Sequence, residues 1–211
     1  VLSVTAQGYV KKTDLMAFSN VRASGIIAAT FDEGDELVDA SITNGDQSIF
    51  IATKEGQSIR FHESDVRDMG RTARGVKGIE LSKNDEVVGV SVLPSNDQSQ
   101  DKILSVSNNG YGKRSEISEY RIQGRGGSGI INIKVTDKTG PLVAVKKVTE
   151  ADDLMIISDK GKVIRTPVDE ISVIGRNTQG VRVISLETGE CVKAIAIAKD
   201  EDAEGEGKVT H

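Results

Sequence analysis

Ser107-Asn108-Asn109-Gly110-Tyr111-Gly112-Lys113-Arg114 is the stretch that decides the fold, because its pattern occurs at four places in the chain. The other copies are Thr5-Ala-Gln-Gly8-Tyr-Val-Lys11-Lys12, Thr53-Lys-Glu-Gly56-Gln-Ser-Ile59-Arg60 and Ser158-Asp-Lys-Gly161-Lys-Val-Ile164-Arg165. From the first copy to the last, the glycines are 48, 54 and 51 residues apart. A nearly constant period of roughly 50 residues predicts a repeat architecture.

A motif rich in glycine and arginine follows each of these stretches. In the second repeat it reads Gly70-Arg71-Thr-Ala-Arg74-Gly75-Val76 and begins 14 residues after Gly56. The motifs that begin at Gly124 and Gly175 also follow the glycine of their own repeat by 14 residues. The first repeat has a shorter version, Val21-Arg22-Ala-Ser-Gly25-Ile26. The common pattern is Gly-Arg-x-x-x-Gly before a β-branched residue.

Short runs with the composition of β-strands lie between these landmarks, and Gly, Asn, Asp or Ser bounds each run. The turn Lys54-Glu55-Gly56 and its equivalents predict hairpins, since Gly adopts the positive φ that such turns require. Four strands per repeat predict an all-β array of propeller-like blades. The expected strands of the second repeat are 49–53, 58–61, 76–81 and 87–93. The repeats are placed at about 1–48, 49–101, 102–153 and 154–198.

Helical structure is expected only as brief turns between the second and third strands of a repeat. The segments 63–69, 116–120 and 168–171 occupy this place in the last three repeats. Each is too short to be stable as an isolated helix. We therefore expect them to be connectors that pack on the sheets.

The composition is that of a β-rich chain from a reducing compartment. Hydrophobic residues make up 37% of the 211 residues, Val and Ile supply most of them, and Trp is absent. The one cysteine, Cys191, excludes an internal disulfide framework and lies in an apolar run, so we expect it to be structural. No apolar run reaches the ~20 residues of a membrane helix, and no signal-peptide pattern opens the chain. We expect a cytoplasmic location without a membrane partner. Because the chain starts in a strand without Met, we also expect it to be part of a longer protein.

The charge is distributed unevenly along the chain. The net charge is −5, and residues 199–211, with five acids and two lysines, contribute −3 of it. This segment is rich in Gly and acids and has little to bury, so we expect a disordered tail. The remaining 198 residues carry only −2. Local basic columns therefore matter more than the total charge.

Two columns of cations run through the repeats. One follows the hairpin glycine, as in Lys11-Lys12 and Lys113-Arg114, and the other is the arginine of the Gly-Arg motif. On radially arranged blades these columns form a band along one rim that neutralises phosphates without reading bases. Two other interpretations stay open: the cations solvate strand ends, or they pair with acids of the following connector. The candidate DNA-binding residues are Lys11, Lys12, Arg22, Arg60, Arg71, Arg74, Lys77, Lys113, Arg114, Arg121, Arg125, Arg165, Arg176 and Arg182.

The residues offer little for catalysis or for metal binding. The string Gly124-Arg-Gly-Gly-Ser-Gly129 matches G-x-G-x-x-G, but a strand-like run follows it, whereas a dinucleotide site requires a helix. The histidines, His62 and His211, have no cluster of ligands around them. We therefore expect no cofactor, no metal and no catalytic site in this segment. A protein-interaction module, or an enzyme with a site at the centre of the blades, is the alternative.

Longer stretches resemble the C-terminal domain of the DNA gyrase A subunit, in the type IIA topoisomerase family. The stretches are 68–78, 110–114, 120–134 and 170–181, and the resemblance extends over residues 1–198. An acidic tail is also typical of that family. The C-terminal domain of the topoisomerase IV A subunit, which has similar blades, is the alternative within the family.

The resemblance implies a β-pinwheel, in which four-stranded blades exchange strands with their neighbours. It implies an outer rim that binds double-stranded DNA without sequence specificity and bends or wraps it. A bacterial, nucleoid-associated type II topoisomerase uses this to introduce negative supercoils with ATP and Mg. The partners would be the gyrase B subunit, in a heterotetramer, together with the rest of the gyrase A subunit. The family has six blades, so the four repeats correspond to the last four.

The wrapping motif of the family has a degenerate counterpart in this chain. The family sequence Gln-Arg-Arg-Gly-Gly-Lys-Gly lies on the first blade, whereas the nearest string here lies in the third repeat. Gly and Ser replace an Arg and the Lys, so the resemblance implies DNA binding more directly than wrapping. The counterpart residues are Gln123, Gly124, Arg125, Gly126, Gly127, Ser128 and Gly129.

Overall fold

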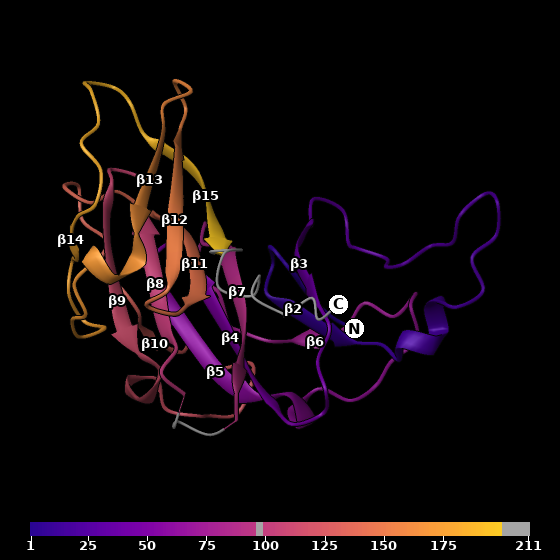
Figure 1. Ribbon diagram of the computed structural model, residues 1–211. Coiled ribbons are helices and arrows are strands. Elements are labelled where there is room, and N and C mark those ends of the chain that lie inside the picture. The colour runs from indigo at the N-terminus through magenta and orange to yellow at the C-terminus, as the bar shows by residue number, and fades with distance from the viewer. Residues whose placement is uncertain (96–98, 200–211) are drawn as a thin grey trace, which may run out of the picture.

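The computed structural model describes residues 1–95 and 99–199 as a series of small antiparallel sheets, shown in Figure 1. The expected acidic tail, apart from Lys199, lies outside the described residues. The strands are β1 (Leu2–Thr5), β2 (Tyr9–Lys12), β3 (Leu37–Ser41), β4 (Gln47–Thr53), β5 (Gln57–His62), β6 (Val76–Lys77), β7 (Val87–Pro94), β8 (Lys102–Ser107), β9 (Tyr111–Glu116), β10 (Ile130–Ile131), β11 (Leu142–Val148), β12 (Asp152–Ser158), β13 (Val163–Pro167), β14 (Val181–Arg182) and β15 (Val192–Lys199).

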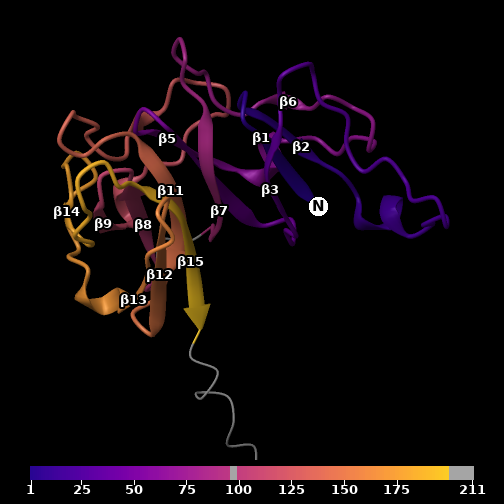
Figure 2. The ribbon, with the colours of Figure 1, turned by 90° about the horizontal axis from the view of Figure 1, so that it is seen from above.

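The sheets are blades of a propeller-like array, as predicted, and neighbouring blades exchange strands. The strand orders are β3-β1-β2-β6, β10-β5-β4-β7 and β11-β8-β9-β14, followed by the three-stranded β13-β12-β15. In each of the first three sheets, three strands come from one repeat and the short edge strand comes from the next repeat. We call β6, β10 and β14 the donated strands. The inner strands β3, β7, β11 and β15 pack against one another in that order (Figures 1 and 2).

The repeated glycine closes the hairpin of every blade. Gly8, Gly56, Gly110 and Gly161 all have φ between 79° and 81°, in the left-handed region that favours glycine. In the second blade the hairpin places Ile51 of β4 opposite Ile59 of β5. The hairpin prediction is confirmed in all four repeats.

A single 3-10 turn follows the second strand of each repeat, which confirms the expected connectors. The turns are η1 (Leu15–Phe18), η2 (Glu63–Asp65), η3 (Ile117–Glu119) and η4 (Val168–Glu170). In the last three repeats, apolar residues in or just after this turn pack in a core cluster together with residues of the preceding repeat. Tyr120, which follows η3, packs edge-on against Phe50 of the preceding repeat, with ring centroids 4.9 Å apart.

The hydrophobic core is divided into three clusters, each shared by two neighbouring blades. The middle cluster combines Phe50 and Leu93 of the second repeat with Ile103, Tyr120 and Ile133 of the third. Each of the first three blades is therefore completed by the following repeat, and neighbouring blades stabilise each other as in other repeat proteins.

The first repeat departs from the prediction of four strands. Its shortened Gly-Arg motif and the residues between the motif and β3 form no strand, and the loops between η1 and β3 extend away from the sheets in Figures 1 and 2. A donated strand needs the hairpin of a preceding repeat, and the described residues contain none before β1. Two first strands, β4 at Gln47 and β12 at Asp152, begin ahead of the expected boundaries at 49 and 154. The described residues include no helix with the length and apolarity needed to cross a membrane.

Candidate nucleic-acid interface

Most of the cations that follow the hairpin glycine lie inside the molecule. This contradicts the prediction that they form an exposed column, because a buried side chain cannot contact a phosphate on the surface. The buried members are Lys11, 5% exposed, Arg60, 1%, Lys113, 0%, and Arg114, 4%. Lys12 is half-buried and lies 3.5 Å from a carboxylate oxygen of Asp68. Arg165, in the last blade, is exposed and donates from Nε to Asp153 at 2.6 Å.

The buried arginines hold the connector of the next repeat. Arg60 donates from Nη1 to the main-chain oxygen of Tyr120 at 3.2 Å. Arg114 donates from Nε to Ile171 O at 2.7 Å and from Nη2 to Asp169 O at 2.9 Å. A guanidinium can satisfy several carbonyls at once, which lets it join two blades through main-chain atoms. These residues are structural.

The buried lysines hold the Gly-Arg loop of the next repeat instead. Lys113 Nζ donates to the main-chain oxygens of Gly175 and Arg176, and Lys11 Nζ donates to that of Arg71. Burial is the main cause that lowers the pKa of Lys113 to about 7; Glu119 opposes it and the charge of Arg176 adds to it. Burial also lowers the pKa of Lys11. Like the arginines, these cations join neighbouring blades.

The arginines of the Gly-Arg motif link successive loops along the outer edges of the blades. Arg125 donates from Nη1 to Lys77 O at 3.1 Å. Arg176 donates from Nη1 to Ile131 O at 2.8 Å, and Arg71 donates from Nη1 to Ile27 O at 2.7 Å. Each acceptor lies two residues after the last glycine of the motif in the preceding repeat. The loops of consecutive repeats therefore form one continuous path.

This path consists of basic segments, and acids such as Glu80, which pairs with Lys77, lie just outside them. We define the outer band as residues 70–77, 121–131 and 172–182, which comprise the Gly-Arg loops and the donated strands. The three segments contain three, two and two cations and no Asp or Glu. The exposed cations of the outer band are Arg74, Arg121, Arg125 and Arg182, and the half-buried ones are Arg71, Lys77 and Arg176. DNA binding by these residues stays a prediction.

Tyrosines from neighbouring strands, and one acid from a loop, orient two of these cations. The Arg74 guanidinium lies 4.1 Å from the ring centre of Tyr9, donates to its hydroxyl at 2.6 Å and also pairs with Asp32. Arg182 donates to the hydroxyl of Tyr111 at 3.2 Å, which lowers the pKa of that tyrosine. These contacts hold the arginine side chain at the edge of the strand. The tyrosine hydroxyl and the carboxylate also compete with a DNA phosphate for the guanidinium.

Arg121 is the band residue with the fewest internal ties. Its side chain is exposed, and no hydrogen bond or ion pair joins it to another residue of the described part of the chain.

Lys134 is an exposed cation that the sequence prediction missed. Its main-chain N–H donates to Thr178 O at 2.9 Å, which places it where two loops of the band meet. Its position shortly after a donated strand is the signal that could have identified it. Arg22 is exposed in the loop region of the first repeat.

The counterpart of the wrapping motif attaches its loop to the neighbouring blade through main-chain groups. Gln123 N donates to Arg60 O at 2.9 Å, and Gly126 N donates to Gly78 O at 2.7 Å. Gly129 has a φ of 74°, and a Cβ there would lie 2.2 Å from Ser58 O, so this position requires glycine. A Cβ at Gly124 or Gly127 would meet no atom within 4 Å. The exposed Ser128 completes the motif.

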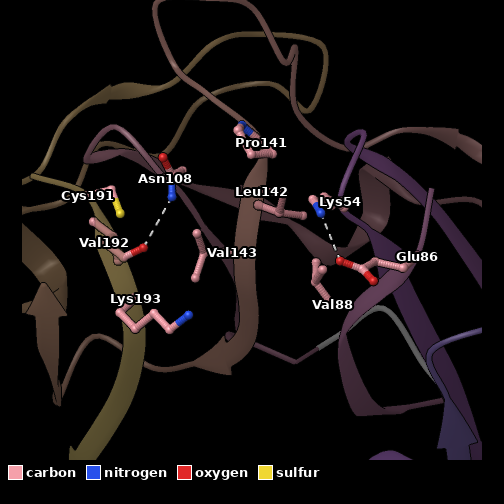
Figure 3. Close-up of a pocket in the computed structure, with 10 residues that line it drawn as sticks. All are labelled: Lys54, Glu86, Val88, Asn108, Pro141, Leu142, Val143, Cys191, Val192 and Lys193. Atoms are coloured by element: carbon pink, nitrogen blue, oxygen red, sulfur yellow. Dashed lines mark hydrogen bonds and ion pairs between the residues drawn. The ribbon is translucent and has the colours of Figure 1, made fainter. Parts of the chain in front are cut away.

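A shallow pocket of about 220 Å³ lies where β7, β11 and β15 approach one another, as Figure 3 shows. Its carboxylate, Glu86, accepts a hydrogen bond from Lys54 Nζ at 3.0 Å. Asn108 Nδ2 donates to Val192 O at 3.5 Å, and the Cys191 side chain lies nearby. No histidine lines the pocket. We assign no chemistry to it, since its carboxylate is engaged in an ion pair.

Comparison with known proteins connects these features to one family. The sequence matches the family described as DNA gyrase C-terminal domain, beta-propeller, over residues 1–44, 47–94, 101–149 and 152–199. The DNA gyrase A protein of Haloquadratum walsbyi is 43% identical over 192 residues, which are 91% of this chain and 22% of that protein. The DNA gyrase A protein of Staphylococcus aureus is 45% identical over 202 residues, or 96% of this chain and 22% of that protein. The chain thus spans about a fifth of these relatives.

Solved structures share the arrangement of the blades. A structure of the DNA gyrase A C-terminal domain has a TM-score of 0.81 at 28% identity and covers 93% of this chain and 64% of its own. The C-terminal domain of DNA topoisomerase IV has a TM-score of 0.87 at 24% identity, covering 94% of this chain and 61% of its own. At that identity the second likeness shows the fold alone.

Proposed function

Because the chain belongs to the DNA gyrase C-terminal domain, beta-propeller, family, we propose that its outer band binds duplex DNA without sequence specificity. The observation that carries this proposal is the continuity of the band. Arg125 and Arg176 each hydrogen-bond to the donated strand of the repeat before. Three acid-free basic segments are thereby held end to end along consecutive blades.

The chemistry of the band suits phosphates better than bases. Its cations stand on short edge strands and tight loops, and the described residues include no α-helix that could enter a major groove. Lys and Arg side chains that contact the DNA backbone release counterions, so binding of this kind weakens steeply with salt and varies little with sequence. The residues proposed to contact DNA are Arg71, Arg74, Lys77, Arg121, Arg125, Lys134, Arg176 and Arg182.

DNA that follows the band would have to bend. The donated strands belong to successive blades, so a duplex in contact with all of them would follow the curve of the array. Bending a duplex costs energy that depends on its sequence, and additional phosphate contacts can offset this cost. We propose that the segment bends DNA, and that the degenerate motif at 123–129 adds main-chain anchoring of its loop more than charge.

The matched segment makes up 22% of the gyrase A relatives. We propose that this segment is the accessory domain of a cytoplasmic type II topoisomerase, within a gyrase A protein that assembles with gyrase B. In that setting, DNA held along the band would be presented to the rest of the enzyme for ATP-dependent negative supercoiling. The reaction itself would be carried out by parts of the protein outside this chain.

Arg121→Ala is the sharpest test of the band, because Arg121 is exposed and has no hydrogen-bond or ion-pair partner among the described residues. Lys193→Ala is the matched control, since it removes one exposed cation from the inner strand β15. Binding to two unrelated duplexes is followed by fluorescence anisotropy over a series of salt concentrations. We expect Arg121→Ala to weaken binding to both duplexes equally and to reduce the log–log salt slope by about 1.

The control separates the band from general electrostatic attraction. Lys193→Ala should leave both affinity and slope close to the wild-type values. Equal effects of the two variants would mean that DNA responds only to net charge, and the band would be rejected. If neither variant nor wild type binds duplex DNA at low salt, the protein-interaction alternative gains support.

A further inference from the structure

We propose that duplex DNA contacts the main chain of this protein at Gly70 and Gly124, the first glycines of two Gly-Arg motifs. The inference rests on the proposed function, since it names a contact that the outer band makes with DNA in addition to its cations. The ligand is a phosphate of the DNA backbone, and the donor is the main-chain N–H of the glycine. A side chain at either position would stand between the two backbones.

Most glycines in the described part of the chain have a structural reason. They have either a positive φ or a neighbour so close that no side chain would fit. Gly78, Gly89 and Gly112 lack a positive φ, but a Cβ there would lie 3.0 Å or less from another atom. The glycines with neither reason all lie in the outer band, and they are Gly70, Gly124, Gly127 and Gly175. Because glycine loses more conformational entropy on folding than alanine does, a reason outside the fold, such as a ligand, is expected for them.

Gly70 and Gly124 leave the main chain bare toward solvent. Both residues are exposed, and a Cβ at either would meet no atom within 4 Å. Gly124 lies in the middle loop of the outer band, which Arg125 joins to the loop before it and Arg176 joins to the loop after it. Its surroundings are therefore complete within the chain. At such a position another backbone can approach more closely than at any residue with a side chain.

Hydrogen bonds hold the main chain just before each of the two glycines. Met69 N donates to Lys12 O at 2.8 Å, and Gln123 N donates to Arg60 O at 2.9 Å. Both acceptors are hairpin cations of the preceding repeat, so the two glycines have equivalent places on successive blades. A group that is held in place before binding loses less conformational freedom on binding, which favours affinity.

The donors at these places suit a phosphate. No described residue accepts a hydrogen bond from the N–H of Gly70 or Gly124, and main-chain N–H groups are regular partners of DNA phosphates. Arg121 and Arg125, both exposed, flank Gly124 in the sequence and supply positive charge. Gly127, which is also exposed and open, extends the bare surface of the same loop. A phosphate bound there fixes the path of the DNA without reading its bases.

Gly175 has the same place in the last repeat but faces a carboxylate. A Cβ at Gly175 would lie 3.5 Å from Glu119 Oε2, which also accepts a hydrogen bond from Arg176 N at 2.8 Å. The main-chain oxygen of Gly175 accepts from Lys113 Nζ and from Thr178 Oγ1, both at 2.8 Å. The carboxylate repels a phosphate and occupies the neighbouring donor. Gly175 is therefore an exposed glycine of the same motif without a site for a phosphate, and it serves as the matched control.

Gly124→Ala tests the contact without changing the charge. Because the position has no positive φ and an open surface, the variant should be at least as stable as the wild type in urea unfolding. The added methyl group should hold the DNA away, and the affinity for duplex DNA, measured by fluorescence anisotropy, should fall about tenfold, as expected for one lost hydrogen bond to a charged group. Gly70→Ala should lose affinity to a similar extent. Gly175→Ala should bind like the wild type.

The salt dependence separates a main-chain contact from a contact by a cation. Gly124→Ala leaves every Lys and Arg in place, so the log–log slope of affinity against salt should stay at the wild-type value. Arg121→Ala, in contrast, should reduce this slope by about 1. The two variants thus weaken binding in ways that one series of titrations can distinguish.

The amide resonances of the glycines report the contact directly. In isotope-labelled protein, titration with a short duplex should shift the N–H signals of Gly70 and Gly124. The signal of Gly175 should shift less, because Glu119 keeps the phosphate away. The signal of Gly189, in the turn before β15 and outside the outer band, should not move.

Four results would overturn the inference while leaving the proposed function intact. Wild-type affinity of Gly124→Ala, together with weaker binding by Arg121→Ala, would mean that the outer band binds DNA through side chains alone. Equal losses in Gly124→Ala and Gly175→Ala would point to the shape of the loops. A salt slope of Gly124→Ala as low as that of Arg121→Ala would assign the loss to displaced cations. Lower stability of Gly124→Ala would show that the fold does require this glycine.

Failure of the proposed function would look different. In that case the wild type would bind no duplex at low salt, and no amide signal of the outer band would respond to DNA. Both the proposed function and the main-chain contact would then be rejected together.

Discussion

Arg125 donates from Nη1 to the main-chain oxygen of Lys77 at 3.1 Å, across 48 residues of sequence and between neighbouring repeats. Its Nε also donates to Asp65 O at 2.8 Å, yet the side chain stays exposed. The same residue therefore ties two loops together and presents a charge to solvent. Its two roles can be separated experimentally.

The Arg125→Lys substitution should keep the positive charge but remove the paired hydrogen bonds to Asp65 O and Lys77 O. A lysine cannot reproduce two hydrogen bonds from a planar fork, so we expect the free energy of unfolding to fall by about 1–2 kcal/mol. The salt slope of DNA binding should stay at the wild-type value, because the number of cations is unchanged. Denaturant unfolding and anisotropy titrations measure the two quantities. Arg125→Ala should reduce both, and a variant Arg125→Lys with wild-type stability would show that the contact to Lys77 is incidental.

The buried arginines should affect stability far more than the exposed arginine of the same column. Arg114→Met removes charge-assisted hydrogen bonds to Ile171 and Asp169 from the interior, and we expect a loss of about 2–4 kcal/mol. Arg165→Met is the matched control from the last blade, where the side chain pairs with Asp153 at the surface. Its loss should be about 1 kcal/mol or less. Urea unfolding of both variants measures the difference, and equal losses would contradict the inter-blade role of Arg114.

The contrast between Arg114 and Arg165 also explains what the sequence could and could not predict. The period of the glycines predicted the hairpins and the blades, since turn geometry is a local property of the chain. The location of the cation after each hairpin depends on the next repeat, which supplies carbonyl oxygens around it. A Lys or Arg at that position has the same sequence signature whether it points to solvent or to a neighbouring blade.

Strand exchange between repeats could not be derived from local pattern either, and came only from the resemblance to a family. The run at 76–81 has the composition of a strand, but only Val76 and Lys77 are assigned to one, and they pair with the preceding repeat. The Gly-Arg loops, in contrast, were predicted to lie together on one rim. Arg71, Arg125 and Arg176 do occupy equivalent places along one path, through hydrogen bonds that the sequence could not reveal.

Lys113 should make stability depend on pH. Its pKa is lowered to about 7 by burial, whereas a lysine in an unfolded chain has a pKa of about 10.4. Between these values the unfolded chain binds more protons at this site, so the stability of the folded state rises with pH. Below about pH 7 both states carry the proton, and the full cost of burying the charge is present.

Lys113→Met isolates this contribution. The free energy of unfolding is measured for wild type and variant from about pH 7 to pH 9. We expect the wild type to gain stability relative to the variant as the pH rises, by up to about 1.4 kcal/mol per pH unit. Other titrating groups cancel in the difference, so a difference that stays constant over this range would contradict an uncharged, buried Lys113.

Removal of residues 200–211 should strengthen DNA binding at low salt. This segment carries five acids and one lysine, and an acidic segment on the same chain competes with phosphates for the cations of the outer band. Anisotropy titrations at low and high salt compare the full chain with the truncated one. We expect the gain in affinity to disappear at high salt, because both interactions are screened there. A full-length control with the five acids changed to Asn or Gln should match the truncated chain. If that control instead binds like the wild type, length and not charge would be responsible, and the competition would be disproved.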